Sequence, residues 1–258
     1  MPSAPLGLPA DVRLRPERDG RIALISCYFG AHEPFNPAAA ASDQPGVEAF
    51  VFTDRPGLVP ADSARAVVLE PSPDGPAIQS RLPKLCPHLF LTGFDWVIYV
   101  DNNARLLHAP ARIIHKVGKE HPDRPAGRYL FRHRRRACAW DEADECLTAG
   151  YMTAAQHDHV TAGFAEAGFP RQAGLYANTV LIQRMGSDAT DRMNESWFAS
   201  LSSHTRRDQV MLPFLLWRDR VPFRVLKPKV KDWAEWPVFS GKAREQFRRD
   251  QQSGPAAL

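Results

Sequence analysis

The amino-acid sequence predicts one α/β domain with a mostly parallel central sheet and helices on both faces. Runs rich in Val, Ile, Phe and Tyr alternate along the chain with segments whose apolar residues recur at helical spacing. The 258 residues suffice for one large domain with a core, and 44% of them are hydrophobic while 24% are charged, as in globular proteins. We expect the folded domain at residues 21–248, between a Pro-rich flexible segment at 1–20 and a flexible tail at 249–258.

The expected strands are short runs of β-branched and aromatic residues that end at polar or turn residues. The run 96–100 (WVIYV) is the clearest, because an uninterrupted apolar run suits a strand that is covered on both faces. The strands are expected at residues 21–29, 47–53, 66–69, 96–100, 128–132, 178–183 and 223–226. Because most of them are separated by helical segments, parallel pairing is favoured.

The expected helices fill the intervals between these strands. Apolar residues have helical spacing over 79–91, but Pro83 and Pro87 interrupt that segment and predict a short or kinked helix. Further helices are expected at residues 109–120, at 141–169 as one or two helices, at 188–202 and at 207–217. In such a sheet the ligand site is expected in the loops that follow the strands.

Charge and cysteine content narrow the expected partners and location. The net charge of +4 is not concentrated in one block, so nucleic acid is not an expected partner. The cysteines (Cys27, Cys86, Cys138 and Cys146) include no C-x-x-C pair, which argues against a zinc site or a disulfide framework and favours reduced thiols in the cytoplasm. No apolar stretch has the length of a signal peptide or a membrane span, so no integral membrane segment is expected.

Polar residues lie at the ends of three expected strands, at the edge where open α/β sheets bind ligands. Asp101 and Asn103 follow the strand 96–100, where Asp101 can face a phosphate-bound metal or a sugar hydroxyl, or simply begin an Asx turn. Tyr28 ends the first strand and can stack on a base, or can be a partly buried aromatic residue. Asp54 follows the second strand and can accept hydrogen bonds from a nucleobase or ribose, or can cap a turn.

A cluster of potentially cationic residues, His133 to Arg136, follows the strand 128–132 and precedes an acidic segment. Guanidinium groups match phosphate oxygens in pairs, so this cluster favours a phosphorylated small molecule as the ligand. The alternative is a helix face with Arg–Glu ion pairs, which suits Arg135, Arg136 and Glu145.

The segment 206–217 (RRDQVMLPFLLW) places an acid and an amide at the start of an apolar helical run. Asp208 and Gln209 can orient a sugar acceptor, or Asp208 can act as a base. The alternative is that Asp208 is an ordinary acid in the first turn of a helix, where it meets the positive end of the helix dipole.

Five segments of the chain resemble a glycosyltransferase-like family that was first described as a domain of unknown function. The family includes plant mucilage-related hexosyltransferases, relatives described as alkaline ceramidases and many bacterial proteins. The matching segments are KLCPHLFL (84–91), WVIYVDNNARL (96–106), FRHRRRACAWDEA (131–143), NTVLIQR (178–184) and RDQVMLPF (207–214). The resemblance covers most of residues 21–232, and the cationic-to-acidic segment and the RDQ segment are its specific parts.

The resemblance implies a GT-A-like fold, which is the single Rossmann-like domain of nucleotide-sugar transferases, and a donor such as a UDP-hexose. By position, Asp101 corresponds to the first acid of the D-x-D metal motif of that fold, whereas Asn103 replaces the second acid with an amide. An acid and an amide hold Mn²⁺ or Mg²⁺ more weakly than two acids, and no His follows His204 to add a ligand, so metal dependence stays open. Lys84 and the arginines at 134–136 offer another way to neutralise the donor diphosphate.

The resemblance also implies transfer of a hexose from a nucleotide sugar to a glycan, peptide or small-molecule acceptor. Asp101 and Asp208 are then the catalytic residues, with Asp208 on the acceptor side as base or positioning residue. The expected substrate-binding residues are Tyr28, Asp54, Lys84, Asn103, His133, Arg134, Arg135, Asn178 and Gln209, and the expected metal ligands are Asp101 and Asn103.

Two other functions stay open at this point. A non-catalytic module that binds a nucleotide or a glycan is favoured by the amide at Asn103. A ceramidase-like amide hydrolase is the second alternative, although the sequence contains neither G-x-S-x-G nor H-E-x-x-H.

Overall fold

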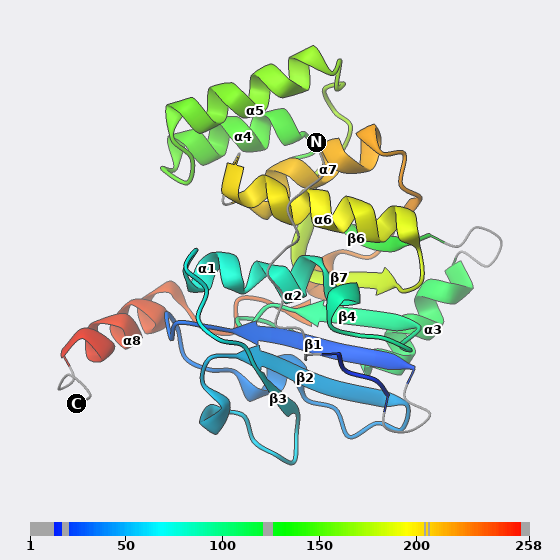
Figure 1. Ribbon diagram of the computed structural model, residues 1–258, viewed down its shortest axis with the longest axis vertical. Helices are drawn as coiled ribbons and strands as arrows, with labels where there is room; N and C mark the ends of the chain where they lie inside the picture. Colours follow the sequence, from blue (N-terminus) through cyan, green and yellow to red (C-terminus); the bar gives the residue numbers. More distant parts are fainter. Residues whose placement is uncertain (1–12, 17–20, 121–125, 204, 206, 254–258) are drawn as a thin grey trace.

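A seven-stranded sheet forms the centre of the protein, whose computed structural model describes residues 13–16, 21–120, 126–203, 205 and 207–253 (Figure 1). The strand order is β3-β2-β1-β4-β7-β6-β8. These strands are β1 (Ile22–Tyr28), β2 (Val47–Thr53), β3 (Arg65–Val68), β4 (Trp96–Val100), β6 (Arg128–Arg132), β7 (Tyr176–Arg184) and β8 (Phe223–Leu226). Within the described sheet, β7 alone runs antiparallel to its neighbours, so the expectation of a mostly parallel sheet is confirmed.

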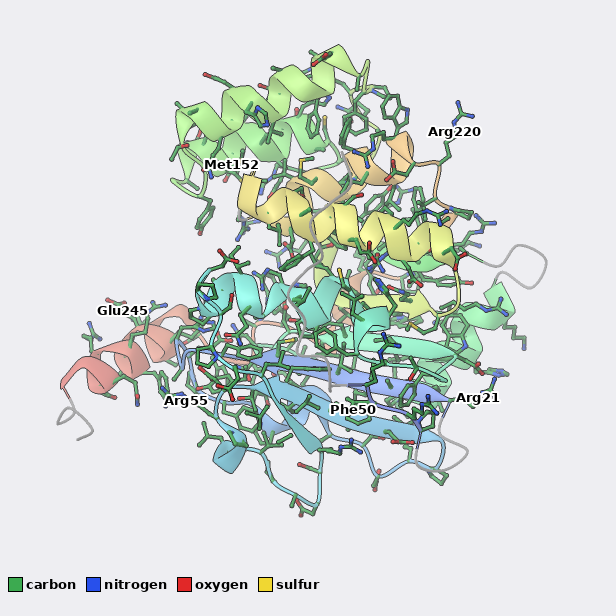
Figure 2. The ribbon with its side chains drawn as sticks, in the orientation of Figure 1. Arg21, Phe50, Arg55, Met152, Arg220 and Glu245 are labelled. Atoms are coloured by element: carbon green, nitrogen blue, oxygen red, sulfur yellow. The ribbon has the colours of Figure 1, made fainter. Side chains whose placement is uncertain are left out.

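Helices cover both faces of the sheet, as the sequence predicts (Figure 1). They are α1 (Pro76–Gln79), α2 (Arg81–Leu85), α3 (Pro110–Glu120), α4 (Ala139–Thr148), α5 (Ala154–Glu166), α6 (Asp188–Ser203), α7 (Asp208–Arg218) and α8 (Gly241–Ser253). Side chains alternate along β1, so that Ala23 and Ile25 join the core shared with α2, α6 and α7, whereas Leu24 joins the core shared with α3. Figure 2 shows the side chains that fill the space between sheet and helices.

The interrupted helical segment at 79–91 breaks before Pro87, whereas Pro83 lies inside α2. Helix α2 ends at Leu85, and Pro87 begins a separate 3₁₀ turn (Pro87–Leu89), because a proline has no N–H to continue the helical hydrogen bonds. The segment 141–169 forms two helices, α4 and α5, in agreement with one of the two possibilities given by the sequence. Short 3₁₀ turns also occur at η1 (Pro37–Ala40), η2 (Pro56–Leu58) and η4 (Val230–Asp232).

Strands β5 and β9 and helix α8 are outside the elements that the sequence predicts. Strand β5 (Arg105–Leu106) pairs antiparallel with β9 (Ala234–Glu235), and two residues per strand are too few to give a periodic pattern. Helix α8 is largely exposed and charged, so it has no apolar face to reveal it, although Ser240 Oγ accepts the Ala243 N–H at 3.1 Å at its start. Residues 249–253 of the expected tail are therefore helical, and 254–258 lie outside the described residues.

The expected flexible segment at 1–20 is described only at residues 13–16. Leu14 is buried there, and its N–H donates to the Phe90 carbonyl at 2.6 Å while its own carbonyl accepts the Thr92 N–H. Residues 1–12 and 17–20 lie outside the described part of the chain. Within the described residues, no helix combines the length and apolarity needed to cross a bilayer.

The strand order marks the carboxyl ends of β1 and β4 as the place where a ligand site is expected. Strand β1 pairs with β2 on one side and with β4 on the other, so the strand order reverses between β1 and β4, and ligands bind at such switch points. Arg21, which precedes β1, and Arg55, which follows β2, lie at opposite ends of the sheet in Figure 2. The parallel strands therefore run toward the side of the molecule that carries α8 (Figure 1).

Candidate ligand site at the carboxyl edge of the sheet

A pocket of about 280 Å³ lies at this edge of the sheet. Its walls come from α2 and α4, from the residues that follow β4 and β6, from the first residues of β7 and α7, and from the segment 230–236. A larger hollow of about 570 Å³ near Leu69 and Phe198 contains one carboxylate, Glu70, and no lysine or arginine among its described residues. Most of the charged residues that the sequence predicts for a ligand site therefore lie around the smaller of these two pockets.

A buried lysine joins two carboxylates in the wall of this pocket. Lys84, from α2, is 3% exposed, and its Nζ lies 3.1 Å from Asp101 Oδ1 and 3.0 Å from Asp208 Oδ2. The ammonium group also lies 4.9 Å from the centre of the Tyr99 ring. A buried charge is costly unless it is paired, and here two acids from distant parts of the chain pair with it. The triad of Asp101, Lys84 and Asp208 thus ties β4, α2 and α7 together.

The hydroxyl of Tyr99 completes the surroundings of Asp101. It donates a hydrogen bond of 2.7 Å to the same Oδ1 atom that faces Lys84. Burial raises the pKa of Tyr99, and the negative charge of Asp101 raises it further, so the hydroxyl keeps its proton. Asp101 is therefore held by two partners rather than by the turn alone.

Asp208 is a strongly ionised carboxylate. Burial would raise its pKa, but Lys84 and Arg81, whose Nε lies 3.6 Å from Oδ2, together lower the pKa to about 2. Such a carboxylate is a weak base at neutral pH. Asp208 is also the first residue of α7, which confirms the interpretation as an acid in the first helical turn. The geometry supports a positioning role better than a role as base.

Positive charge predominates around the pocket. Among its described lining residues, six are lysine or arginine and three are carboxylates. The cations are Arg81, Lys84, Arg134, Arg136, Arg207 and Lys231, and the acids are Asp101, Glu142 and Asp208. A surplus of cations in a concave site favours an anionic ligand, and guanidinium groups suit phosphate oxygens in particular.

The residues of the basic cluster have different environments. Arg134 lines the pocket, whereas the adjacent Arg135 is exposed outside it. Arg136 Nε pairs with the buried Glu142 at 2.5 Å, and its Nη1 lies 3.5 Å from Glu145. The expected Arg–Glu pairing is therefore confirmed for Arg136, but this residue precedes α4 and does not lie on a helix face. Arg134 is the residue of this cluster with a guanidinium exposed at the pocket.

His133 faces the pocket as a neutral donor. Its Nδ1 accepts the backbone N–H of Arg136 at 3.2 Å, which places the proton of the neutral ring on Nε2. Burial lowers the pKa of His133, although Glu142 opposes the effect. The ring therefore offers an N–H group to a ligand without adding charge at neutral pH.

Asn178 is a buried amide without a protein partner. It is 3% exposed and lines the pocket, and neither its Oδ1 nor its Nδ2 has a hydrogen-bond partner among the described residues. A buried polar group without a partner is unusual and points to a bound molecule. Gln209 lines the same pocket and donates through Nε2 to the Tyr176 carbonyl at 3.1 Å.

Two expected nucleoside-binding residues lie outside the pocket. Tyr28 is 1% exposed, its hydroxyl donates to the Glu33 carbonyl at 2.8 Å, and its ring packs edge-on against Phe35, which leaves no free face for a base. Asp54 accepts the Gly30 N–H at 3.0 Å, which agrees with the alternative of a turn-capping acid. Neither Tyr28 nor Asp54 lines the pocket that contains Asp101.

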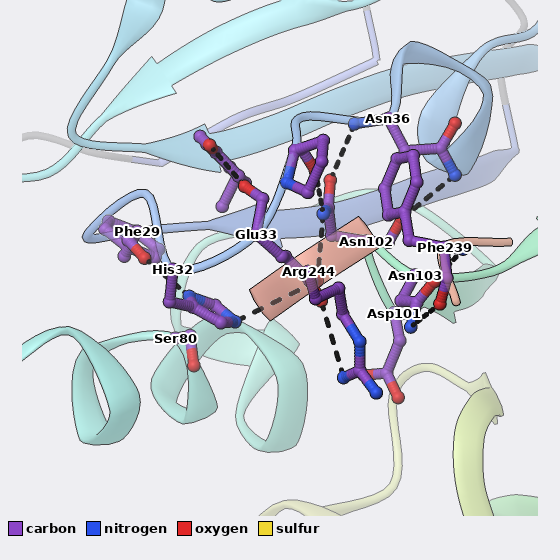
Figure 3. A network of polar contacts seen from close by, with 12 residues as sticks. Phe29, His32, Glu33, Asn36, Ser80, Asp101, Asn102, Asn103, Phe239 and Arg244 are labelled. Carbon is purple, nitrogen blue, oxygen red and sulfur yellow. Dashed lines mark hydrogen bonds and ion pairs between the residues drawn. The ribbon is translucent and has the colours of Figure 1, made fainter. Parts of the chain in front are cut away.

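Asn103 is also not among the lining residues of the pocket, and Figure 3 shows it beside Phe239. Its Oδ1 accepts the Phe239 N–H at 2.6 Å, and its Nδ2 lies 3.5 Å from the Phe239 carbonyl. Asp101 Oδ1 is already held by Lys84 and Tyr99, and the described residues contain no group of three side chains that could hold a metal ion. The side chains present do not form the metal cradle of a D-x-D motif, so we derive no step through a metal.

Several lining residues were not identified from the sequence. Arg81 lies one helical turn before Lys84, and Arg207 precedes the Asp208–Gln209 pair, so both stand next to motifs that were recognised. Arg207 also stacks on the Tyr151 ring at 4.5 Å. Lys231 comes from the short 3₁₀ turn η4, where no local pattern marks it.

No family model matches the chain, and no curated protein matches it significantly.

Proposed function

We propose that the protein is a glycosyltransferase of GT-A-like fold that moves a hexose from a nucleotide sugar to an acceptor in the cytoplasm. The observation that carries the proposal is the cationic pocket at the carboxyl edge of the sheet, in whose wall the buried Lys84 lies between Asp101 and Asp208. A donor diphosphate supplies the negative charge that this pocket lacks, and the unpartnered amide of Asn178 suits the hydroxyl groups of a sugar. The motif resemblance favours a UDP-hexose among such donors.

In this proposal the cations of the pocket bind the donor diphosphate, and the two acids hold Lys84 in position. Arg134, Arg207 and Lys231 bind the diphosphate, and Lys84 adds a positive charge that Asp101 and Asp208 hold in place. As the bond from the anomeric carbon to the diphosphate oxygen breaks, its electron pair passes to the diphosphate. Fixed cations stabilise that developing charge without reorganisation.

The acceptor oxygen forms the new bond to the anomeric carbon and loses its proton. Asp208 is a poor base because its pKa is about 2. We assign this proton to the departing diphosphate, which is the stronger base, and we assign Asp208 and Asp101 to the positioning of Lys84.

A second function is favoured by one specific observation. Both acids of the triad are already paired with Lys84, so neither is free to act as a strong base. This arrangement also suits a module that binds a nucleotide sugar without turning it over. The ceramidase-like hydrolase gains no such support, because no serine or cysteine is among the described lining residues of the pocket.

An acceptor screen with UDP-hexoses tests the proposed activity. The release of UDP in the presence of an acceptor is expected from the wild-type protein, with a lower rate from Arg134→Ala. Arg135→Ala is the matched control, because Arg135 is the adjacent exposed arginine outside the pocket. Binding of the donor without release of UDP under any condition would support the binding module instead.

A further inference from the structure

One wall of the pocket is a C-terminal segment that lies along the chain after β4. Residues 230–240 run beside residues 103–107, with β9 pairing to β5 at Leu106↔Ala234 and Arg105↔Glu235. The Leu107 N–H donates to the Trp233 carbonyl at 2.8 Å. This segment contributes Lys231, Ala234 and Trp236 to the pocket.

Asn103 forms hydrogen bonds with the C-terminal end of this segment, at residues 238 and 239 (Figure 3). Its backbone carbonyl accepts the Val238 N–H at 3.1 Å, and its side-chain Oδ1 accepts the Phe239 N–H at 2.6 Å. Its Nδ2 faces the Phe239 carbonyl at 3.5 Å. A carboxylate offers no donor to that carbonyl, so this contact requires an amide rather than an acid. The amide at this position thus has a structural reason that is independent of any metal.

Trp236 lies between these two attachments and faces solvent at the pocket. It is 50% exposed, whereas Trp233 in the same segment is 2% exposed and packs in the core. Because half of its surface is exposed at the pocket, the indole is open to contact with a bound ligand. Lys231 and Arg134 line the same pocket, so a cationic region and a flat aromatic face are available to one ligand.

We infer that Trp236 is a stacking platform for a ring that is covalently attached to the phosphate bound by the cationic pocket, and that Asn103 is the residue that positions it. The inference rests on the proposed function, because it takes the ligand to be a nucleotide sugar or part of one. The ring is either the nucleobase or the hexose, and both bring a face that stacks on an indole together with an attached phosphate.

Calorimetric titration with three probes tests the platform. UDP carries a base, glucose 1-phosphate carries a hexose, and inorganic pyrophosphate carries neither ring. Trp236→Ala is expected to weaken the binding of UDP, of glucose 1-phosphate or of both by about ten-fold, and to leave pyrophosphate affinity within about two-fold. Trp217→Ala is the matched control, because Trp217 is 38% exposed and lies outside the pocket. It is expected to change none of the three affinities.

A double-mutant cycle tests the role of Asn103. If Asn103 acts by positioning Trp236, then Asn103→Ala combined with Trp236→Ala binds the affected probe no more weakly than Trp236→Ala alone. Asn103→Asp keeps the acceptor but loses the donor to Phe239, so it serves the same cycle if the alanine variant does not fold. Additive losses in the double variant would overturn the positioning role.

The failure of this inference can be distinguished from the failure of the proposed function. If the wild-type protein binds UDP and Trp236→Ala binds every probe as tightly as the wild type does, then the platform role of Trp236 is wrong and the proposed function stands. If the wild-type protein binds pyrophosphate but neither ring-bearing probe more tightly, then the platform is also wrong. If it binds none of the probes, then the proposed function and the inference are both wrong.

Discussion

Removing the buried ammonium group of Lys84 is expected to destabilise the fold in a pH-dependent way. Lys84→Met keeps the aliphatic stem but leaves Asp101 and Asp208 without their shared partner. The pKa of Asp208 is lowered from 3.8 to about 2 in the folded protein, which corresponds to about 2 kcal/mol of favourable interaction with the ionised group. Because removal of one partner of a buried pair also leaves the other uncompensated, the cost at pH 7 is expected to be about 3–5 kcal/mol.

The sign of the pH dependence follows from the two states of Asp208. In the wild type its folded pKa is depressed, so its contribution to stability is present above the unfolded pKa of 3.8 and is lost as the pH falls toward about 2. In Lys84→Met the burial of Asp208 is less well compensated, so its pKa rises and the carboxyl group takes up a proton more readily. The cost of the substitution is therefore expected to be smaller at pH 4 than at pH 7, by about 1 kcal/mol or more.

Urea unfolding at the two pH values, followed by tryptophan fluorescence, measures this difference. Lys231→Met is the matched control, because Lys231 is an exposed lysine of the same pocket and its loss is expected to change stability by less than about 0.5 kcal/mol. A cost below about 1 kcal/mol for Lys84→Met at pH 7, or the same cost at both pH values, would contradict the assignment of Lys84 as a buried cation paired with two acids.

Three further predictions concern the pocket and its support. Arg134→Ala is expected to weaken the binding of inorganic pyrophosphate about ten-fold by calorimetry, whereas Arg135→Ala is expected to leave it unchanged, and equal losses would refute a specific phosphate contact. Asn194→Ala is expected to lower the free energy of unfolding in urea by about 3 kcal/mol, and a loss below about 1 kcal/mol would contradict this expectation. The reason is that Asn194 Oδ1 accepts two hydrogen bonds from the buried Arg128, at 3.0 and 2.6 Å, and burial lowers the pKa of Arg128 to about 10. His133 is expected to titrate below 6.5 by NMR, and its contribution to stability is present above the unfolded pKa of 6.5 and lost as the pH falls through the lower folded pKa. A titration above 6.5 would contradict the neutral donor assignment.

Much of the sheet was predictable because its signals are local. The runs at β2, β4, β6 and β8 end at the residues where the sequence predicts, since each is an apolar run bounded by polar or turn residues. The break at Pro87 was predictable for the same reason, because proline changes the backbone wherever it stands. Helix α8 and the β5–β9 pair were not, because neither depends on an apolar period in its own sequence.

The candidate site was predictable only in part. Asp101 was singled out because it ends the clearest strand, and Asp208 because it begins an apolar helix. Their meeting at Lys84 is a long-range contact that no local spacing indicates. The hydrogen bond between Asn103 and Phe239 depends on where the C-terminal segment packs. The sequence therefore shows that an amide replaces an acid at position 103, but it does not show which contact the amide makes.

The most direct test is a thermal-shift measurement with UDP-glucose in EDTA on the wild type, Arg134→Ala and Arg135→Ala. A ligand that binds only the folded state raises the Tm by mass action. Because charge neutralisation is assigned to protein cations, the wild type and Arg135→Ala are expected to show the same rise in EDTA, and Arg134→Ala a smaller one. No rise with any nucleotide or nucleotide sugar, whether in EDTA, Mg²⁺ or Mn²⁺, would contradict the donor site, and a rise that requires a metal would contradict the assigned role of the cations.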